Sequence, residues 1–360
     1  MARIEPEIRL DFRDVLLVPQ PSPKVFGDVS RNGVSLVSRY GIARGTCPII
    51  AANMDHVGTF KMAQALASFH TYTCLVKHYT IPDLIEFYLD NPAIGKYAIY
   101  SMGCNDTDFA KFSSFQRILE HKNVIAGPKI VCIDVANAYI PNILAFLEKF
   151  KITYPQYHIM AGNVVTPERT LELLTYGADI VKVGIGPGSA CATRRETGVG
   201  YPQLSAVLEC ASAAAEVNGS ICSDGGIECP GDVVKAFAAG ANWVMIGGQF
   251  AGHVEGYKDA ELLEATKYGN GNKLPFYGMA SQSAQVKHNG GLAEYRASEG
   301  KEFMVPMRGK IATTMQHYLG GIRSACTYLS CLGIDDLRED ATFIKVNQQL
   351  NHSQDIYEVR

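Results

Sequence analysis

One cysteine of the chain stands in a segment suited to nucleophilic chemistry. Cys191 ends the run Gly-Ile-Gly-Pro-Gly-Ser-Ala-Cys that begins at Gly184, and the three glycines let the backbone fold tightly around the sulfur. Backbone N–H groups, or a nearby cation such as Arg194, would favour the thiolate, which is the reactive form. The pattern therefore predicts a nucleophilic thiol. The alternatives are an unreactive loop cysteine, or a loop whose inward-facing carbonyls ligate a monovalent cation.

Two glycine pairs predict a phosphate site. Gly225-Gly226 follows Asp224, and Gly247-Gly248 follows the next apolar run. Glycine has no side chain, so backbone N–H groups can approach a phosphate at a helix N-terminus. Asp224 would repel the phosphate but can accept hydrogen bonds from ribose hydroxyls, and this combination suggests a nucleotide. The alternative is that both pairs only form tight turns.

The elements that must position these residues repeat one cycle. From about residue 47, a short apolar run is followed by a polar turn and then by a segment with helical spacing of apolar residues. Near-continuous apolar runs indicate strands buried on both faces, as in a parallel sheet covered by helices. Eight such units predict a (β/α)8 barrel, with its active site at the carboxyl ends of the strands. A doubly wound open sheet is the competitor, but its G-x-G-x-x-G fingerprint is missing.

Residues typical of helix starts and helix ends support this cycle. Thr166-Pro167-Glu168 predicts a capped helix start and Gly177 its end, and Pro230 with Gly240 repeats the pattern. The eight predicted strands span residues 48–54, 73–77, 97–102, 129–135, 158–164, 180–184, 220–224 and 243–247.

The chain is predicted to be a single barrel domain with additions at both ends. Residues 1–46 form an N-terminal extension, whose apolar patch at 15–18 predicts a short strand pair or a cover over one barrel end. Residues 47–250 hold the barrel strands and helices. Residues 251–360 are expected to form a flap beside the barrel mouth and a C-terminal segment, with an apolar helix over 311–332.

Composition excludes several classes of partner. The 360 residues carry a net charge of −3, and no basic run exceeds Arg194-Arg195, so nucleic acid and membrane surfaces are not expected partners. No stretch has the length of a membrane span, and the N-terminus lacks the apolar core of a signal peptide. The ten cysteines are scattered singly without metal-site spacing, so reduced thiols and a cytoplasmic location are expected.

Six motifs together carry a resemblance to a known family. They are Asn53-Met54-Asp55, Met160-Ala161-Gly162-Asn163-Val164, the 184–191 loop, Gly200-Tyr201-Pro202-Gln203, Ser223-Asp224-Gly225-Gly226 and Tyr277-Gly278-Met279. These segments closely resemble the IMP dehydrogenase/GMP reductase family, and the match covers nearly the whole chain. The resemblance implies a purine nucleotide substrate, a nicotinamide cofactor and a homotetramer of barrels.

Three features favour the reductase branch of that family. Lys77 runs straight into a predicted helix over 81–89, which leaves no room for the regulatory domain pair that dehydrogenases usually carry there. The flap lacks the Arg-Tyr pair with which dehydrogenases activate water, since Tyr295-Arg296 has the reverse order. Segments 293–301 and 320–324 resemble the reductase branch. Departures from relatives are a small insertion at 268–272 and Val76 before Lys77.

The resemblance implies NADPH-dependent reductive deamination of GMP to IMP and ammonia. Cys191 would attack C2 of the base, Thr193 with Glu299 would provide the proton for the departing amine, and hydride would then reduce the covalent thioimidate. The implied substrate-binding residues are Ser189, Asp224, Gly225, Gly226, Gly247, Gly248, Gly278, Met279, Ala280, Arg296, Ser298 and Gly300. The implied cofactor-binding residues are Lys77, Asp134, Val135, Ala136, Tyr295 and Ser324. The implied K⁺ ligands are carbonyls of Gly186, Gly188, Cys191 and Arg194.

Other interpretations stay open at this point. An IMP dehydrogenase lacking the regulatory domains would make XMP, and an FMN-dependent barrel could use the same glycine pairs for the flavin phosphate. A catalytically silent nucleotide sensor is a further alternative. Judged without the resemblance, Asp134, Lys77 and Glu299 would be taken as an ordinary loop cap, a solvated charge and a surface carboxylate.

Overall fold

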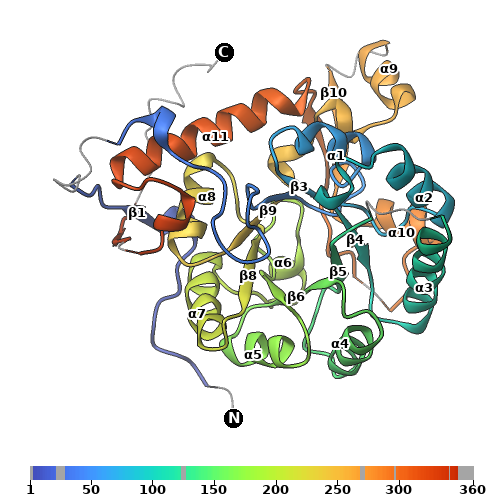
Figure 1. The fold of residues 1–360 in the computed structure, drawn as a ribbon, viewed down its shortest axis with the longest axis horizontal. Coiled ribbons are helices and arrows are strands. Elements are labelled where there is room, and N and C mark those ends of the chain that lie inside the picture. Colours follow the sequence, from blue (N-terminus) through green and yellow to red (C-terminus); the bar gives the residue numbers. More distant parts are fainter. Residues whose placement is uncertain are drawn as a thin grey trace.

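Eight parallel strands close into a barrel in the computed structural model, which describes residues 3–21, 29–122, 127–267, 272–295, 297–339 and 341–347 (Figure 1). Each strand pairs in parallel with the next, and the last pairs with the first. This confirms all eight predicted strands and rules out the open sheet. The strands are β2 (Ile49–Ala51), β3 (Tyr72–Cys74), β4 (Ala98–Met102), β5 (Ile130–Asp134), β6 (His158–Val164), β7 (Ile180–Val183), β8 (Ser220–Asp224) and β9 (Trp243–Ile246).

Helices cover the outside of the barrel and begin where the sequence signals predict. Pro167 and Pro230 occupy the first turns of their helices, and Gly177 and Gly240 follow the helix ends with φ of +107° and +98°, a region that favours glycine. Thr166 is the N-cap residue, as predicted, but its hydroxyl makes no capping hydrogen bond and instead accepts one from Tyr139 at 3.1 Å. The covering helices are α1 (Phe60–Ala67), α2 (Ile81–Asp90), α3 (Asp106–His121), α4 (Asn142–Thr153), α5 (Pro167–Thr175), α7 (Gln203–Glu216) and α8 (Pro230–Ala238).

A strand of the N-terminal extension pairs with a strand of the C-terminal segment. The predicted strand at 15–18 exists as β1 (Val15–Leu17), and its antiparallel partner is β12 (Phe343–Lys345), more than 300 residues later. The predicted C-terminal helix is α11 (Ile311–Tyr328), which packs on α8 and α1. No helix in the described part of the chain is long and apolar enough to cross a membrane.

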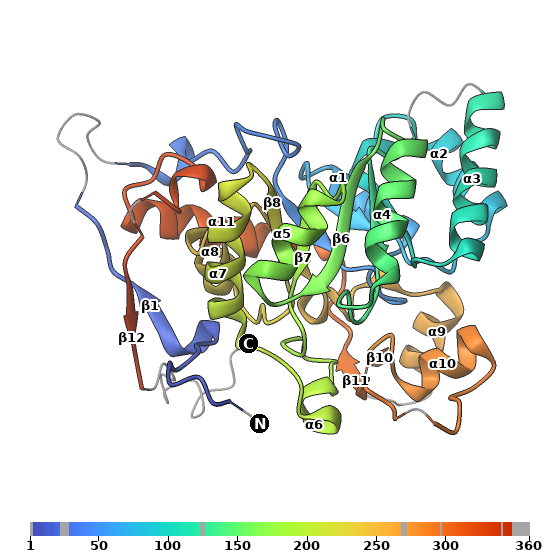
Figure 2. The same cartoon turned by 90° about the horizontal axis from the view of Figure 1, so that it is seen from below.

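The segment between the barrel and α11 has structure of its own. Strands β10 (Lys273–Tyr277) and β11 (Glu302–Pro306) form an antiparallel pair, and α9 (Asp259–Lys267) and α10 (Gln282–Asn289) lie beside it. Figure 2 shows this group on the same side of the molecule as α6 (Thr193–Thr197), which follows Cys191. We call residues 273–306 the flap. It lies at the carboxyl ends of the barrel strands, where the active site was predicted.

Candidate active site

The flap is joined to the Cys191 loop by backbone hydrogen bonds. Cys191 forms an antiparallel bridge with Gly300. The Ala192 N–H donates to the Glu299 carbonyl at 2.7 Å, and the Lys301 N–H donates to the Ala190 carbonyl at 2.9 Å. Residues about 110 positions apart in the chain therefore form one continuous wall of the site.

This pairing brings the three predicted catalytic residues together. The Cys191 thiol donates to Thr193 Oγ1 at 3.2 Å, and the Thr193 hydroxyl donates to Glu299 Oε2 at 2.8 Å. All three side chains are partly buried. A thiol, a hydroxyl and a carboxylate in this order form a chain along which a proton can move between the sulfur and the carboxylate.

The predicted phosphate site is built from glycines that allow close approach. Gly225 and Gly226 have φ of +92° and +76°, and a Cβ added to Gly225 would lie 3.0 Å from Pro187 of the Cys191 loop. A Cβ added to Gly248 would overlap the hydroxyl of Ser189. The loops after β7, β8 and β9 therefore converge, and only small residues fit between them.

The predicted base-binding loop lies against the same wall. The Gly278 N–H donates to the Lys301 carbonyl at 3.0 Å, and a Cβ on Gly278 would overlap the carbonyl of Ala190. Met279 is half-buried and Ala280 is exposed. Ser298 donates to the Gly300 carbonyl at 3.3 Å. Arg296 and residues 268–271 of the predicted insertion at 268–272 lie outside the described residues.

Sequence reasoning missed a buried lysine under the site. Lys182 is 1% exposed, and its ammonium contacts Asp134 and lies 3.2 Å from Asp224 Oδ2, which also accepts a hydrogen bond from Asn163 at 2.9 Å. Burial acts to lower the pKa of Lys182, but the two carboxylates outweigh it and raise the pKa well above its ordinary value. The signal that could have revealed it was a lysine inside the apolar run Ile-Val-Lys-Val of β7.

The predicted nicotinamide side is open to solvent. Burial acts to raise the pKa of Asp134, but Lys182 and, more weakly, Lys77 outweigh it, so the pKa lies below its ordinary value. Lys77 and Ala136 are exposed, and Val135 is half-buried. The positive charge of Lys77, close enough to help lower the pKa of Asp134, suits a cofactor that carries phosphate groups. Tyr295 is 85% exposed.

One predicted cofactor-binding residue, Ser324, lies on a helix rather than in a loop that follows a barrel strand. Ser324 is on α11, where its neighbour Gly321 packs against Pro230 of α8. α11 packs on α8 and α1 and is part of the helix layer around the barrel. The assignment of Ser324 to the cofactor site stays a prediction.

Arg194 does not point to the thiol as expected. Its guanidinium donates to the Tyr201 carbonyl and to Asp11 Oδ2, the latter at 3.3 Å, so it anchors the N-terminal extension. The carbonyls of Gly188 and Arg194 accept hydrogen bonds from Cys191 and Gly198 at 3.0 and 3.1 Å, and each oxygen keeps a second lone pair for a cation. Among the described residues, no cluster of His, Cys, Asp or Glu side chains is suited to a metal ion.

Comparison with known proteins settles the relationship of the chain. The model of the IMP dehydrogenase / GMP reductase domain matches residues 112–354. The chain belongs to the IMP dehydrogenase/GMP reductase family. It is 48% identical to GMP reductase 2 of Mus musculus over 356 residues, which cover 98% of each chain. It is also 48% identical to GMP reductase of Serratia proteamaculans (strain 568), over 97% of this chain and 98% of the relative. For GMP reductase of Caenorhabditis elegans, the identity is 48% over 98% and 96% of the two chains.

The connection after the second barrel strand is short in this chain. Residues 75–80 lead directly from β3 to α2, as the sequence predicts, so no regulatory domain is inserted there. The relatives named above span the same length as this chain and are all reductases.

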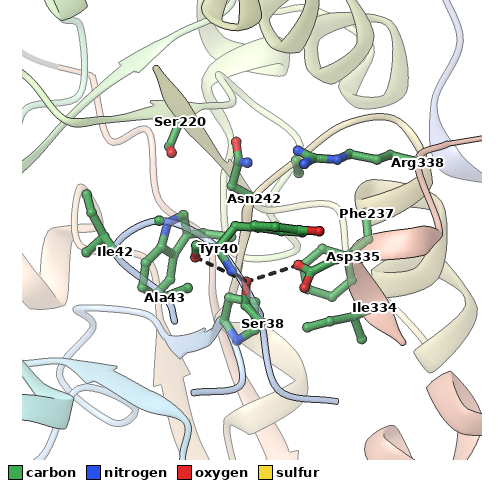
Figure 3. A pocket seen from close by; sticks show the side chains of 14 residues that line it. Ser38, Tyr40, Ile42, Ala43, Ser220, Phe237, Asn242, Ile334, Asp335 and Arg338 are labelled. Carbon is green, nitrogen blue, oxygen red and sulfur yellow. Dashed lines mark hydrogen bonds between the residues drawn. The ribbon is translucent and has the colours of Figure 1, made fainter. Parts of the chain in front are cut away.

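A separate cavity is shown from close by in Figure 3. It opens at the amino ends of β2, β8 and β9, where Trp243, Asn242 and Tyr40 line it. Ser38 at its rim donates to Asp335 at 3.0 Å. Because Cys191 follows the carboxyl end of β7, this cavity is not the predicted family site.

Proposed function

We propose that the protein reduces GMP to IMP and ammonia, with NADPH as the hydride donor. The observation that carries the proposal is the chain of contacts from Cys191 through Thr193 to Glu299. It lies beside the glycine pairs 225–226 and 247–248, which we call the glycine cradle. The relatives called GMP reductase, 48% identical over nearly the whole chain, support this choice of substrate over IMP.

The glycine cradle would hold the phosphate of GMP. Ser189 and the backbone of Gly226, Gly247 and Gly248 offer donors, and the Asp224 carboxylate accepts hydrogen bonds from the ribose hydroxyls. The base then lies between the Cys191 loop and the loop at 278–280. Held in this way, C2 of the purine is presented to the sulfur.

The first half of the reaction forms the C2–S bond and breaks the C2–N bond. The Cys191 thiolate adds to C2, and the exocyclic amine must take up a proton before it leaves as ammonia. Thr193 is placed to pass that proton, and Glu299 accepts from the Thr193 hydroxyl at 2.8 Å and so orients it. The product of this half is a thioimidate between Cys191 and the purine.

The second half reduces the same carbon. NADPH, when bound, supplies a hydride to C2, and the C2–S bond then breaks to return the thiolate and release IMP. Over both halves, GMP, NADPH and two protons give IMP, ammonium and NADP⁺. Lys77, Asp134, Val135 and Ala136 are the residues of this chain that would orient the nicotinamide half.

Further features of the proposal concern ions and assembly. We place K⁺ on the carbonyls of Gly186, Gly188, Cys191 and Arg194, where it would order the loop that carries the thiol. We also propose a homotetramer located in the cytoplasm, in which Ser324 serves a site formed with a neighbouring copy rather than its own.

A product assay tests the proposed function. Purified protein is incubated with GMP and NADPH, and in parallel with IMP and NAD⁺, while IMP, XMP and ammonia are quantified. Equal amounts of IMP and ammonia from the first mixture support the proposal. XMP from the second mixture alone would assign the protein to dehydrogenation instead.

A further inference from the structure

We infer that Asp55 is a positioning residue that holds the base-binding loop at 278–280 on the barrel and couples it to Lys77. The inference rests on the proposed function, in which that loop contacts the purine. Asp55 follows β2, and its side chain is only 2% exposed. A buried carboxylate of this kind requires polar partners, so each partner shows what the residue holds.

The partners of Asp55 flank the base-binding loop on both sides. The hydroxyl of Tyr277, directly before the loop, donates to Asp55 Oδ2 at 2.7 Å. After the loop, Lys287 Nζ and His288 Nε2 of α10 lie 2.9 and 2.8 Å from the same oxygen. One barrel carboxylate thus ties down the strand that enters the loop and the helix that leaves it. We call these four residues the Asp55 clamp.

The charge states of Asp55 and Tyr277 favour the hydrogen bonds of the clamp. Burial acts to raise the pKa of Asp55, but hydrogen bonds from Lys287, Tyr277 and His288 outweigh it and hold the pKa below its ordinary value. Burial and the Asp55 carboxylate raise the pKa of Tyr277, so the phenol stays protonated and donates. A charge-assisted network of this type is stronger than neutral hydrogen bonds.

A ring stack extends the clamp to the predicted cofactor side. The imidazoles of His288 and His78 lie 3.6 Å apart between centroids, with planes 7° from parallel. His78 directly follows Lys77. Movement of α10 would therefore move the backbone that carries Lys77, and substrate and cofactor binding would depend on one contact.

A second stack fixes the ring of Tyr277 from the barrel side. His56, next to Asp55, contacts Tyr277 edge-on at 4.9 Å and stacks on Tyr257 at 4.6 Å. His56 Nε2 also lies 3.6 Å from Glu261 of α9. The loop after β2 therefore supports both the hydroxyl and the ring of Tyr277.

Asp55→Asn tests the clamp, because the amide fills the same volume but removes the charge. Hydrogen exchange of residues 278–289 is measured in protein without nucleotide, and KM and kcat for GMP are measured with NADPH. We expect faster exchange in this segment and a KM raised about tenfold, because only the fraction of molecules with an ordered loop binds substrate. The kcat should change less than about threefold, since bound GMP restores the loop.

Two further variants make the result decisive. Tyr277→Phe removes only the hydroxyl and should reproduce the effect in weaker form, even if Asp55→Asn folds poorly. Asp106→Asn, which removes a carboxylate that is 98% exposed and 3.4 Å from Lys149, is the matched control and should change neither readout.

The exchange measurement separates this inference from the proposed function. If the wild-type protein fails to reduce GMP, the proposed function is wrong, yet faster exchange at 278–289 in Asp55→Asn still supports the clamp. Unchanged exchange in both Asp55→Asn and Tyr277→Phe overturns it. A loss of kcat at unchanged KM overturns it as well, because a positioning role acts on binding.

Discussion

Lys182 Nζ lies 3.2 Å from Asp224 Oδ2 and also contacts Asp134, so one buried ammonium joins the carboxylates proposed for ribose and nicotinamide. Removing it would leave two carboxylates without their counter-ion. We expect Lys182→Met to lose about 3–5 kcal/mol of unfolding free energy, as found when one partner of a buried ion pair is removed. Urea unfolding measures this loss. The control is Lys61→Met, because Lys61 forms an exposed ion pair with Asp259 at 2.8 Å; its loss should cost less than about 1 kcal/mol of unfolding free energy. An equally small loss in Lys182→Met would contradict the account.

Thr193 is expected to act on the rate of the chemistry. Thr193→Val removes the hydroxyl that bridges Cys191 and Glu299, and kcat should fall about 10²–10⁴-fold, the usual contribution of a positioned proton donor. Thr193→Ser keeps the hydroxyl and should recover most of this loss. GMP affinity, measured by calorimetry, should stay within about threefold in both variants. Equal activity in the valine and serine variants would exclude Thr193 from proton transfer.

Gly248 is expected to be intolerant of a side chain. In Gly248→Ala the new methyl group overlaps the Ser189 hydroxyl, which must turn away from the cradle. We expect GMP binding to weaken about tenfold, the cost of roughly one lost phosphate hydrogen bond. Gly320→Ala is the control, because a Cβ at Gly320 of α11 meets nothing within 4 Å. Equal GMP affinity in the two variants would show that the cradle does not hold the phosphate.

The stability of the protein should depend on pH through His78. Burial, reinforced by the charges of His288, Lys77 and Lys111 and opposed by Asp55, lowers the pKa of His78 to about 4. The unfolded chain, with a histidine pKa near about 6.5, binds the proton more readily. The contribution of neutral His78 to the free energy of unfolding is therefore complete above about pH 6.5 and is lost as the pH drops toward about 4.

His78→Gln should flatten this dependence. The wild-type protein is expected to lose about 1–3 kcal/mol of His78-linked stability between pH 6.5 and 4, which thermal midpoints at several pH values can follow. His121→Gln, at an exposed position at the end of α3, should leave the wild-type slope unchanged. Identical slopes in wild type and His78→Gln would refute the assignment.

The barrel was readable from the sequence because its strands are buried on both faces. Continuous apolar runs such as β5 and β9 leave little ambiguity, and proline and glycine mark the helices between them. The antiparallel partner of β1 was not predictable, because its pairing with β12 depends on a contact between distant ends of the chain. Alternation within such short strands does not specify a partner.

The candidate site was predicted where residues share one loop or carry a family motif. Cys191 and Thr193 are two positions apart, and the motif supplied Glu299. Sequence could not show that Arg194 turns to Asp11, 183 residues away, or that Lys182 lies inside the barrel. Both depend on which charges the fold brings together, and charge pairing across a barrel leaves no periodic pattern along the chain.

The central claim is that Cys191 forms a covalent bond with C2 of the purine. Intact mass spectrometry after acid quench, followed by peptide mapping, tests it during turnover of GMP with NADPH. We expect an adduct equal to GMP minus ammonia on the peptide that contains Cys191, and no adduct or turnover in Cys191→Ala, which should still bind GMP. Appreciable turnover in Cys191→Ala would contradict the account.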